Sequence, residues 1–77
     1  MKMRIVSPLI VIAETDIDSL RAEDASGGFG ILPGHAPFLT ALTISIVSWR
    51  KAGRERFCAV RGGVLKVIDG SMVAIAS

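Results

Sequence analysis

Short apolar runs and alternating stretches, separated by turn-forming residues, recur along the whole chain. Alternation of apolar and polar residues and runs of β-branched residues are both typical of strands. No segment keeps the 3.6-residue apolar period of an amphipathic helix over enough turns to be stable. We therefore expect strands at residues 3–7, 9–13, 19–25, 39–49, 56–60, 64–68 and 72–76.

Three features of this pattern need a further argument. Pro8 interrupts the first apolar stretch, which suits an edge or a bend between two strands. Residues 19–25 are rich in Leu, Arg, Ala and Glu, which also favour helix, but so short a segment does not make a stable helix and a strand is favoured. Residues 39–49 exceed one short strand, which predicts a bend or bulge near 43–45.

Turn signals set the connections between these strands. The Asp-Gly pair at 69–70, flanked by two β-branched runs, is the strongest hairpin signal in the chain. Residues 51–54 predict a second hairpin loop, the Gly-Gly pair at 62–63 a turn, and residues 14–18 a polar turn. The spacing predicts an all-β fold of about seven to ten short antiparallel strands, arranged as a sandwich or a flattened barrel.

Residues 27–40 concentrate unusual residue types. This stretch holds four of the eight glycines, two of the three prolines and the only histidine, His35, together with large apolar side chains such as Phe29 and Phe38. Glycine allows backbone conformations closed to other residues, and proline fixes φ. We expect a shaped, partly buried and rigid loop that serves as a contact surface, rather than a flexible linker.

Length and composition indicate one small domain spanning residues 1–77. The single cysteine, Cys58, has no partner for an internal disulfide, and with one histidine it cannot build a structural zinc site. No apolar run is long enough to span a bilayer. The basic start and apolar run resemble a short signal peptide, but Ser7 and Pro8 break the run and no cleavage site follows, so strands are favoured.

The net charge of +2 is unevenly distributed. The charged residues at 14–24 are mostly acidic, and those at 50–66 are mostly basic. Nucleic-acid binding is disfavoured, because the basic half has no interleaved aromatic residues and the acidic half would repel phosphate. The segregation favours either faces that pair within the domain or electrostatic steering toward a partner.

Candidate chemical groups are few. Asp16 and Asp18 form the only close carboxylate pair and lack further ligands, so a solvated turn is favoured over a metal or acid–base site. His35 has no nucleophile beside it in sequence, which favours a structural or contact role. The glycines at 27, 28 and 30 lack the lysine and the following helix of a phosphate loop. Cys58 is expected to pack as a small hydrophobe, while Trp49 suits a core position or an interface anchor equally well.

One stretch carries a specific resemblance. Residues 30–42, Gly-Ile-Leu-Pro-Gly-His-Ala-Pro-Phe-Leu-Thr-Ala-Leu, resemble the signature of the epsilon subunit of bacterial F-type ATP synthases, called delta in mitochondria. Residues 5–8 resemble the opening strand of that family, and residues 61–67 resemble its Ser-Gly-Gly-hydrophobic segment. The resemblance covers essentially the whole chain and implies the N-terminal domain of epsilon, a ten-stranded β-sandwich of two five-stranded sheets.

The resemblance also implies a function. In that family the domain lies at the foot of the rotating central stalk, with one face on the gamma subunit and loops at one end on the membrane c ring. It couples ion-driven rotation to the alpha/beta catalytic head, has no cofactor and performs no chemistry. The implied location is peripheral, on the cytoplasmic face of the bacterial plasma membrane, without direct membrane insertion.

Site residues follow from the resemblance by position. Ser7, His35 and Thr40 match the gamma contacts, and Gly28 with the adjacent Phe29 matches the c-ring contact. Many relatives have Glu where this chain has Gly28, so the ionic part of that contact is missing here. The residues expected to shape the loop are Gly30, Pro33, Gly34 and Pro37.

Two departures from the family narrow the expectation. Residues 42–50 and 20–26 look more like the divergent alternate synthases, called N-ATPases and associated with sodium, although the coupling ion would be chosen in the c ring. The C-terminal helical hairpin of the family has no counterpart in these 77 residues, so inhibition and ATP binding by that hairpin are not implied.

The sequence also suggests two other classes of function. A free-standing β module could bind a small molecule or peptide with residues 27–40 as its pocket wall. An enzyme using His35 with Asp16 or Asp18 is disfavoured, because those groups have no supporting residues nearby in sequence.

Overall fold

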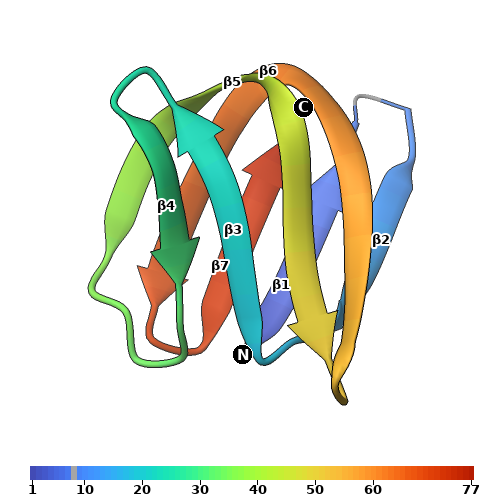
Figure 1. The fold of residues 1–77 in the computed structure, drawn as a ribbon, viewed down its shortest axis with the longest axis vertical. Helices are drawn as coiled ribbons and strands as arrows, with labels where there is room; N and C mark the ends of the chain where they lie inside the picture. The colour runs from blue at the N-terminus through green and yellow to red at the C-terminus, as the bar shows by residue number, and fades with distance from the viewer. Residues whose placement is uncertain (8) are drawn as a thin grey trace.

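The computed structural model describes residues 1–7 and 9–77, and this part of the chain forms seven β-strands without a helix (Figure 1). The expected all-β fold is therefore confirmed. Pro8, expected to interrupt the first apolar stretch, lies outside the described residues. The strands are β1 (Lys2–Val6), β2 (Val11–Asp16), β3 (Ser19–Asp24), β4 (Gly27–Ile31), β5 (Phe38–Lys51), β6 (Arg54–Asp69) and β7 (Met72–Ala76).

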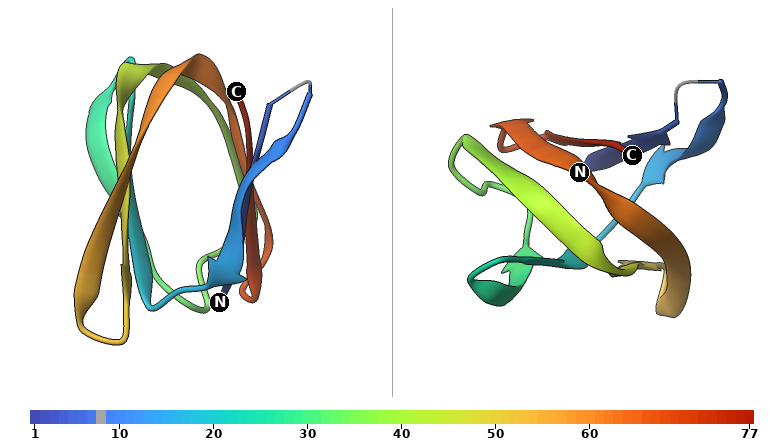
Figure 2. Two further views of the ribbon diagram at one scale, coloured as in Figure 1. Left: turned by 90° about the vertical axis from the view of Figure 1, so that its right-hand side faces the viewer. Right: turned by 90° about the horizontal axis from the view of Figure 1, so that it is seen from above.

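All seven strands belong to one hydrogen-bonded sheet in the order β2-β1-β7-β6-β5-β3-β4. The sheet folds over on itself into a sandwich, because β5 and β6 are long and arch from one layer into the other (Figure 2). The five-stranded layer contains β2, β1, β7, the second half of β6 and the first half of β5. The four-stranded layer contains the first half of β6, the second half of β5, β3 and β4.

Three expectations about strands are corrected by this arrangement. Seven strands lie within the seven to ten expected from the spacing, but they form one sheet rather than the two five-stranded sheets that the resemblance implies, because β5 and β6 each run through both layers. Residues 56–60 and 64–68 are parts of one continuous β6. The Gly-Gly pair at 62–63 is accordingly a bend inside a strand and not a turn between strands. The pairing is also not purely antiparallel, since β1 lies parallel to β7.

Two segments expected to be irregular are partly strand. Residues 14–16 extend β2 instead of forming a turn, since an edge strand can present Glu14 and Asp16 to solvent while Ala13 and Thr15 face inward. The first part of the 27–40 loop is β4, which pairs with β3 over five residues. The irregular loop is therefore confined to residues 32–37.

The bend of the sandwich rests on two glycines. Gly62 and Gly63 have φ of 93° and 115°, in the region that residues with a Cβ rarely adopt. They lie opposite the expected bend of β5, where the pairing of β3 with β5 is interrupted between Arg21 and Asp24. A Cβ at Gly63 would lie 2.2 Å from the carbonyl oxygen of Ala76, so β7 can run alongside β6 only because position 63 has no side chain.

Side chains between the layers form one hydrophobic core. Strands of both layers bury every second residue, as the sequence alternation predicts. Trp49 belongs to this core, which decides between its two expected roles, and the half-buried Cys58 packs against it as a small hydrophobe. The buried hydrophobic residues are Met3, Ile5, Ile17, Leu20, Ala22, Ile31, Leu42, Val47, Trp49, Val60, Leu65, Val67, Val73 and Ile75.

The two ends of the sandwich carry different connections (Figure 1). At one end, called the bend end, lie the bends of β5 and β6, the C-terminus, and the β1–β2 and β3–β4 connections; the Ser77 amide donates to the Val6 carbonyl there. At the other end, called the loop end, lie the N-terminus, residues 32–37, and the β5–β6 and β6–β7 turns. The Gly34 amide donates to the Gly70 carbonyl at 2.8 Å across this end.

Replacing Gly63 by Ala should destabilise the domain by at least about 3 kcal/mol, because it combines a disfavoured positive φ with a backbone collision at Ala76. Chemical denaturation followed by circular dichroism measures this change. The matched control is Gly28→Ala, whose Cβ would come no closer than 3.9 Å to another atom and should be nearly neutral. Equal effects of the two substitutions would contradict the role given to Gly63.

Candidate functional site

Residues 32–37 have a defined shape because a reverse turn and a backbone contact hold them. The His35 amide donates to the Leu32 carbonyl at 3.1 Å, with Pro33 and Gly34 at the two central positions. Gly34 has φ of 87°, so the pair forms a type II turn, in which proline suits the first central position and glycine the second. A Cβ on Gly70 would lie 2.8 Å from the Cα of Gly34, so the loop and the β6–β7 turn are in direct backbone contact.

Three rings line the side of the sandwich between β4 and β5. Phe29 of β4 and Phe38 of β5 are packed edge to face with their centroids 5.6 Å apart, and His35 lies against Phe38 at 5.7 Å. The Nδ1 of His35 donates to the carbonyl of Ala36 at 2.7 Å. The ring of His35 is therefore fixed in place by one hydrogen bond and one aromatic contact.

Thr40 lies on the same side, further toward the bend end. Its hydroxyl donates to Oδ2 of Asp24 at 2.9 Å, and Oδ1 of Asp24 accepts the Ser26 amide at 2.8 Å. The Asp24 carboxylate thus joins β5 to the β3–β4 turn. Sequence reasoning missed this role of Asp24, although an aspartate two residues before a serine in a turn is a known local signal.

Ser7 lies apart from these residues. It follows β1 at the bend end, where its amide donates to the Ile10 carbonyl at 2.9 Å and its hydroxyl is hydrogen-bonded to the Ile10 backbone. The structure therefore brings Phe29, His35 and Thr40 to one side of the sandwich and leaves Ser7 at the tip of the β1–β2 hairpin. Pro37 directly precedes β5, and Gly28 and Gly30 are exposed on β4.

The outer face of the five-stranded layer is apolar and uncovered. Leu39 is 66% exposed, and Val64 and Ile68 on the neighbouring β6 are each 46% exposed. A shallow hollow of about 550 Å³ lies on this face. The residues around it are Arg4, Val6, Leu39, Val64, Lys66, Ile68, Met72, Ala74, Ile75 and Ala76.

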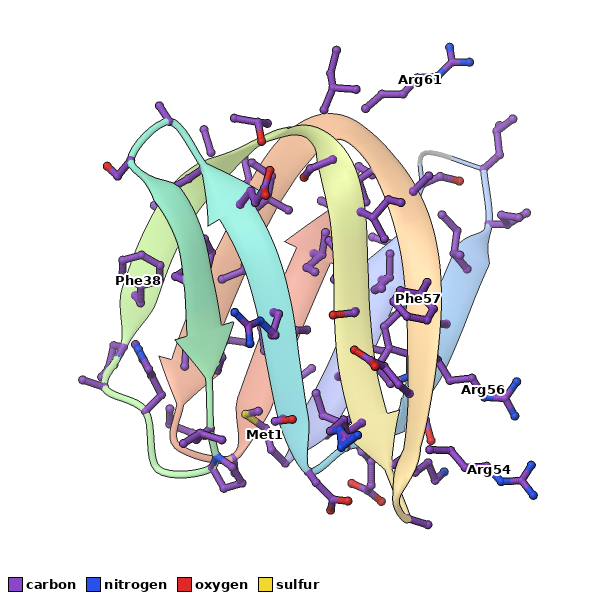
Figure 3. All side chains as sticks on the ribbon, in the orientation of Figure 1. Met1, Phe38, Arg54, Arg56, Phe57 and Arg61 are labelled. Carbon is purple, nitrogen blue, oxygen red and sulfur yellow. The ribbon has the colours of Figure 1, made fainter. Side chains whose placement is uncertain are left out.

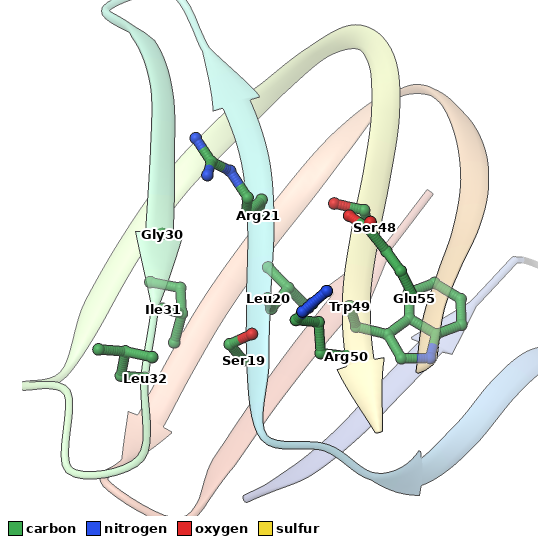
Figure 4. Close-up of a pocket in the computed structure, with 10 residues that line it drawn as sticks. All are labelled: Ser19, Leu20, Arg21, Gly30, Ile31, Leu32, Ser48, Trp49, Arg50 and Glu55. Carbon is green, nitrogen blue, oxygen red and sulfur yellow. The ribbon is translucent and has the colours of Figure 1, made fainter. Parts of the chain in front are cut away.

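The outer face of the four-stranded layer is more polar. A hollow of about 630 Å³ on this face is bordered by Arg21, Arg50 and Glu55, with Ser19 and Ser48 between them (Figure 4). Ser19 lies opposite Arg50 on the next strand, and Arg21 lies opposite Ser48, so serine and arginine alternate over the face.

The acidic stretch 14–24 and the basic stretch 50–66 form no ion pair with each other among the described residues. Arg4 and Glu14 form the one ion pair of the described residues, at 3.4 Å with both side chains half exposed. The carboxylate of Asp18 accepts the Ala52 amide at 3.2 Å, so the acidic stretch caps the β5–β6 turn. The side chains of Arg54, Arg56 and Arg61 extend away from the sandwich (Figure 3). Most of the basic charge is thus left on the surface.

No group of three or more His, Cys, Asp or Glu residues within residues 1–7 and 9–77 could hold a metal ion. In the same part of the chain, no helix is long and apolar enough to cross a membrane. Asp16 ends β2, and Asp18 lies in the β2–β3 connection with its carboxylate bonded to the Ala52 amide.

The β6–β7 turn that supports the loop is held by Asp69. Oδ1 of Asp69 accepts hydrogen bonds from the hydroxyl and the amide of Ser71. The side-chain hydrogen bond first, and then the backbone one, lower the pKa of this exposed carboxyl below its ordinary value of 3.8. The turn residues Gly70 and Ser71 connect β6 to β7, so the hairpin expected from the Asp-Gly pair is confirmed.

Because the folded-state pKa of Asp69 is depressed, its hydrogen bonds should stabilise the turn above the ordinary pKa and be lost as the pH falls through the folded-state value. An NMR titration of the Asp69 carboxyl carbon measures that pKa. Ser71→Ala should raise it toward the ordinary value, whereas Ser45→Ala, which removes a hydroxyl bonded to the Thr43 carbonyl, should leave it unchanged. An unchanged titration in Ser71→Ala would contradict this account.

The fold and its surfaces define a class of protein: a small β-sandwich domain with an apolar outer face on one layer and a more polar outer face on the other. Comparison with known proteins identifies its family. The chain belongs to the family described as the beta-sandwich domain of the ATP synthase Delta/Epsilon chain, and the match spans residues 1–77.

Individual relatives agree with this family. The chain is 56% identical over 69 residues to ATP synthase epsilon chain 2 of Paraburkholderia xenovorans, covering 88% of this chain and 49% of the relative. It is 45% identical over 76 residues to ATP synthase epsilon chain 2 of Cereibacter sphaeroides, covering 96% of this chain and 52% of the relative. The chain therefore spans about half the length of the curated relatives it matches.

Solved structures share the fold. A chain in the Euglena gracilis mitochondrial ATP synthase structure, containing OSCP, F1 and the c-ring, superimposes with a TM-score of 0.91 at 19% identity, covering 97% of this chain and 48% of that one. A chain in the central stalk and c-ring structure of the Tetrahymena thermophila mitochondrial ATP synthase gives a TM-score of 0.82 at 15% identity, covering 97% and 60%. These similarities establish the β-sandwich fold.

Proposed function

We propose that this chain is the β-sandwich domain of a non-catalytic rotor subunit in the central stalk of an F-type ATP synthase. It connects the gamma subunit to the c ring and couples ion-driven rotation to ATP synthesis or hydrolysis in the alpha/beta head. The observation that carries this proposal is family membership over residues 1–77. The solved structures of similar fold come from assemblies whose names include the c-ring and, in one case, the central stalk.

The gamma subunit is proposed to dock on the outer face of the five-stranded layer. The three positions expected to contact gamma all belong to this layer or border it: Ser7 follows β1, Thr40 lies in the first half of β5, and His35 lies in the loop that enters β5. Although Ser7 and His35 lie at opposite ends of the sandwich, one partner lying across this face would reach both. The exposed Leu39 and Ile68 lie between them and supply apolar area to bury.

The c ring is proposed to contact β4 in the other layer, through Gly28 and Phe29. Gly28 is exposed at the start of β4, whereas Phe29 is partly buried against Phe38. A glycine offers backbone and shape rather than charge, so this contact would depend on close approach. The exposed arginines of β6 are proposed to steer the domain toward acidic partner surfaces.

The proposed location is peripheral, on the cytoplasmic face of a bacterial plasma membrane, as part of the assembled synthase. Two relatives are named epsilon chain 2, which supports an alternate kind of synthase of the N-ATPase type. A free-standing ligand-binding module remains the competing function, and the hollow on the four-stranded layer is the feature that would serve it.

The rotor function predicts that the chain co-purifies with its cognate gamma subunit in a one-to-one complex at micromolar concentration. Leu39→Lys should weaken this complex about tenfold or more, because a charge replaces exposed apolar area on the proposed face. Phe57→Lys is the matched control, since Phe57 is 65% exposed on the outer face of the other layer. Absence of gamma binding by the wild-type chain would overturn the rotor assignment, and a larger effect of Phe57→Lys would move the docking face.

The shape of residues 32–37 should matter more for assembly than the carboxylates do. Gly34→Val forces a β-branched residue to φ of 87° and displaces the type II turn from the β6–β7 turn. Asp16→Ala removes an exposed charge at the end of β2. Reconstitution with gamma and the c ring should lose about tenfold or more with Gly34→Val and little with Asp16→Ala, once circular dichroism shows both variants folded. Equal losses would mean that the loop has no special role.

A further inference from the structure

Strand β4 is an edge strand of the sheet, and it has none of the features that usually prevent pairing with another chain. It ends the strand order and pairs only with β3 within the described part of the chain. Its residues, Gly-Gly-Phe-Gly-Ile, include no charge and no proline, and its register with β3 is continuous. An exposed, regular edge without charge, proline or bulge is a template for pairing with a further strand.

Two other strand edges carry the usual protections, while the free edge of β5 is confined to its first residues, which directly follow Pro37. The β2 edge presents Glu14 and Asp16, and its register with β1 shifts near its start. The first half of β6 begins with Arg54, Glu55 and Arg56. Charges and register irregularities at an edge discourage pairing with other chains. Strand β4 differs from these two edges because it has neither.

Two of the three glycines of β4, Gly28 and Gly30, are not required by the fold of the single chain, whereas Gly27 has φ of 115°. A Cβ at Gly30 would come no closer than 3.8 Å to another atom, and one at Gly28 no closer than 3.9 Å. Neither residue is among those with positive φ. Their effect is to leave the outer face of β4 bare next to the charged side chains of β3.

Those charged side chains are arranged in a self-complementary way. Arg21 lies opposite Gly30 and Glu23 lies opposite Gly28, while Ala22 lies opposite Phe29 between them. Both Arg21 and Glu23 are exposed, and Figure 4 shows Arg21 extending from β3 toward β4 and Gly30. Neither forms an ion pair within the described residues.

We propose that two copies of this chain pair antiparallel through β4, with Phe29 opposite its own copy on the twofold axis. Gly30 then lies opposite Gly28 of the second copy. On the outer face, directly opposite residues of the four central strands then form a row: Arg21, Gly30, Gly28 of the second copy and Glu23 of the second copy. The twofold axis generates a second row of the same composition. Three strand spacings separate the two charged residues, on the order of 14 Å between Cα atoms. An extended arginine and an extended glutamate close this span by lying flat over the two glycines.

The charges select this register. Centring the axis on Gly28 would place Glu23 in the same row as its own copy, and centring it on Gly30 would do the same for Arg21. Like charges in one row are destabilising, whereas the register centred on Phe29 contains two rows of opposite charges. The two four-stranded layers then form one continuous sheet across the axis.

The pairing concerns the free subunit and does not rest on its function as a rotor part. The paired edge includes Gly28 and Phe29, so a paired copy could not also present β4 to another partner. Failure of the pairing would leave the proposed function untouched. Loss of gamma binding, conversely, would not affect the pairing.

Sedimentation velocity of the full chain tests the proposal, from about 10 µM to about 1 mM at about 50 mM salt, where exposed charges are weakly screened. A reversible dimer is expected. Arg21→Glu and Glu23→Arg should each raise the dissociation constant about tenfold or more, since each creates two like-charge rows. The double variant Arg21→Glu/Glu23→Arg restores opposite charges and should return to within about threefold of the wild-type value.

The control is the double variant Glu55→Arg/Arg61→Glu, which makes the same exchange of charges on β6 and should leave the dissociation constant unchanged. A chain that stays monomeric at about 1 mM overturns the proposal. It is equally overturned if the single variants behave like the control or if the double exchange fails to restore pairing.

Disulfide trapping tests the register. In a Cys58→Ala background, a mixture of Gly28→Cys and Gly30→Cys chains should form the mixed disulfide on mild oxidation, because directly opposite Cα atoms lie about 4.5–5.5 Å apart. Two Gly28→Cys chains should form little disulfide, since their Cα atoms would be more than about 7 Å apart. Preferential formation of the Gly28→Cys homodimer would overturn the register.

Discussion

The close approach of two backbones at Gly63 is the constraint on which the sandwich depends. The carbonyl of Ala76 occupies the space where any other residue at position 63 would place its Cβ. Because β6 can bend there beside β7, the β5–β6 hairpin continues from one layer into the other. The same two strands therefore run through both layers, and residues 1–7 and 9–77 enclose a two-layer core with seven strands.

A second backbone contact holds the loop end in place. Gly34 and Gly70 touch without intervening side chains, and the Asp69 carboxylate holds the turn that contains Gly70. The type II turn of residues 32–35, closed by the hydrogen bond from His35 to Leu32, is therefore also fixed to the β6–β7 hairpin. The rings of His35, Phe38 and Phe29 continue this fixed surface along the side of the sandwich.

The two layers present different surfaces to partners. The five-stranded layer offers apolar side chains over a shallow hollow, which suits a large face-to-face contact. The four-stranded layer offers alternating serine and arginine and a bare strand edge, which suits directional contacts. These unlike faces suit the proposed function of a subunit that connects two different partners.

Local sequence signals were sufficient for the class of fold, the positions of most strands and both two-residue hairpins, because alternation and turn preferences act over a few residues. They also marked residues 27–40 as a shaped loop, although only residues 32–37 of it are irregular, where proline followed by glycine defines the turn locally. They failed at the Gly-Gly pair, which is a bend within β6 because β5 pairs along it. They failed likewise at β4, a strand only because β3 pairs with it. The parallel pairing of β1 with β7, the joining of Thr40 to Asp24, and the separation of Ser7 from His35 unite residues distant in the chain. No local preference specifies such contacts; packing of the whole sandwich decides them.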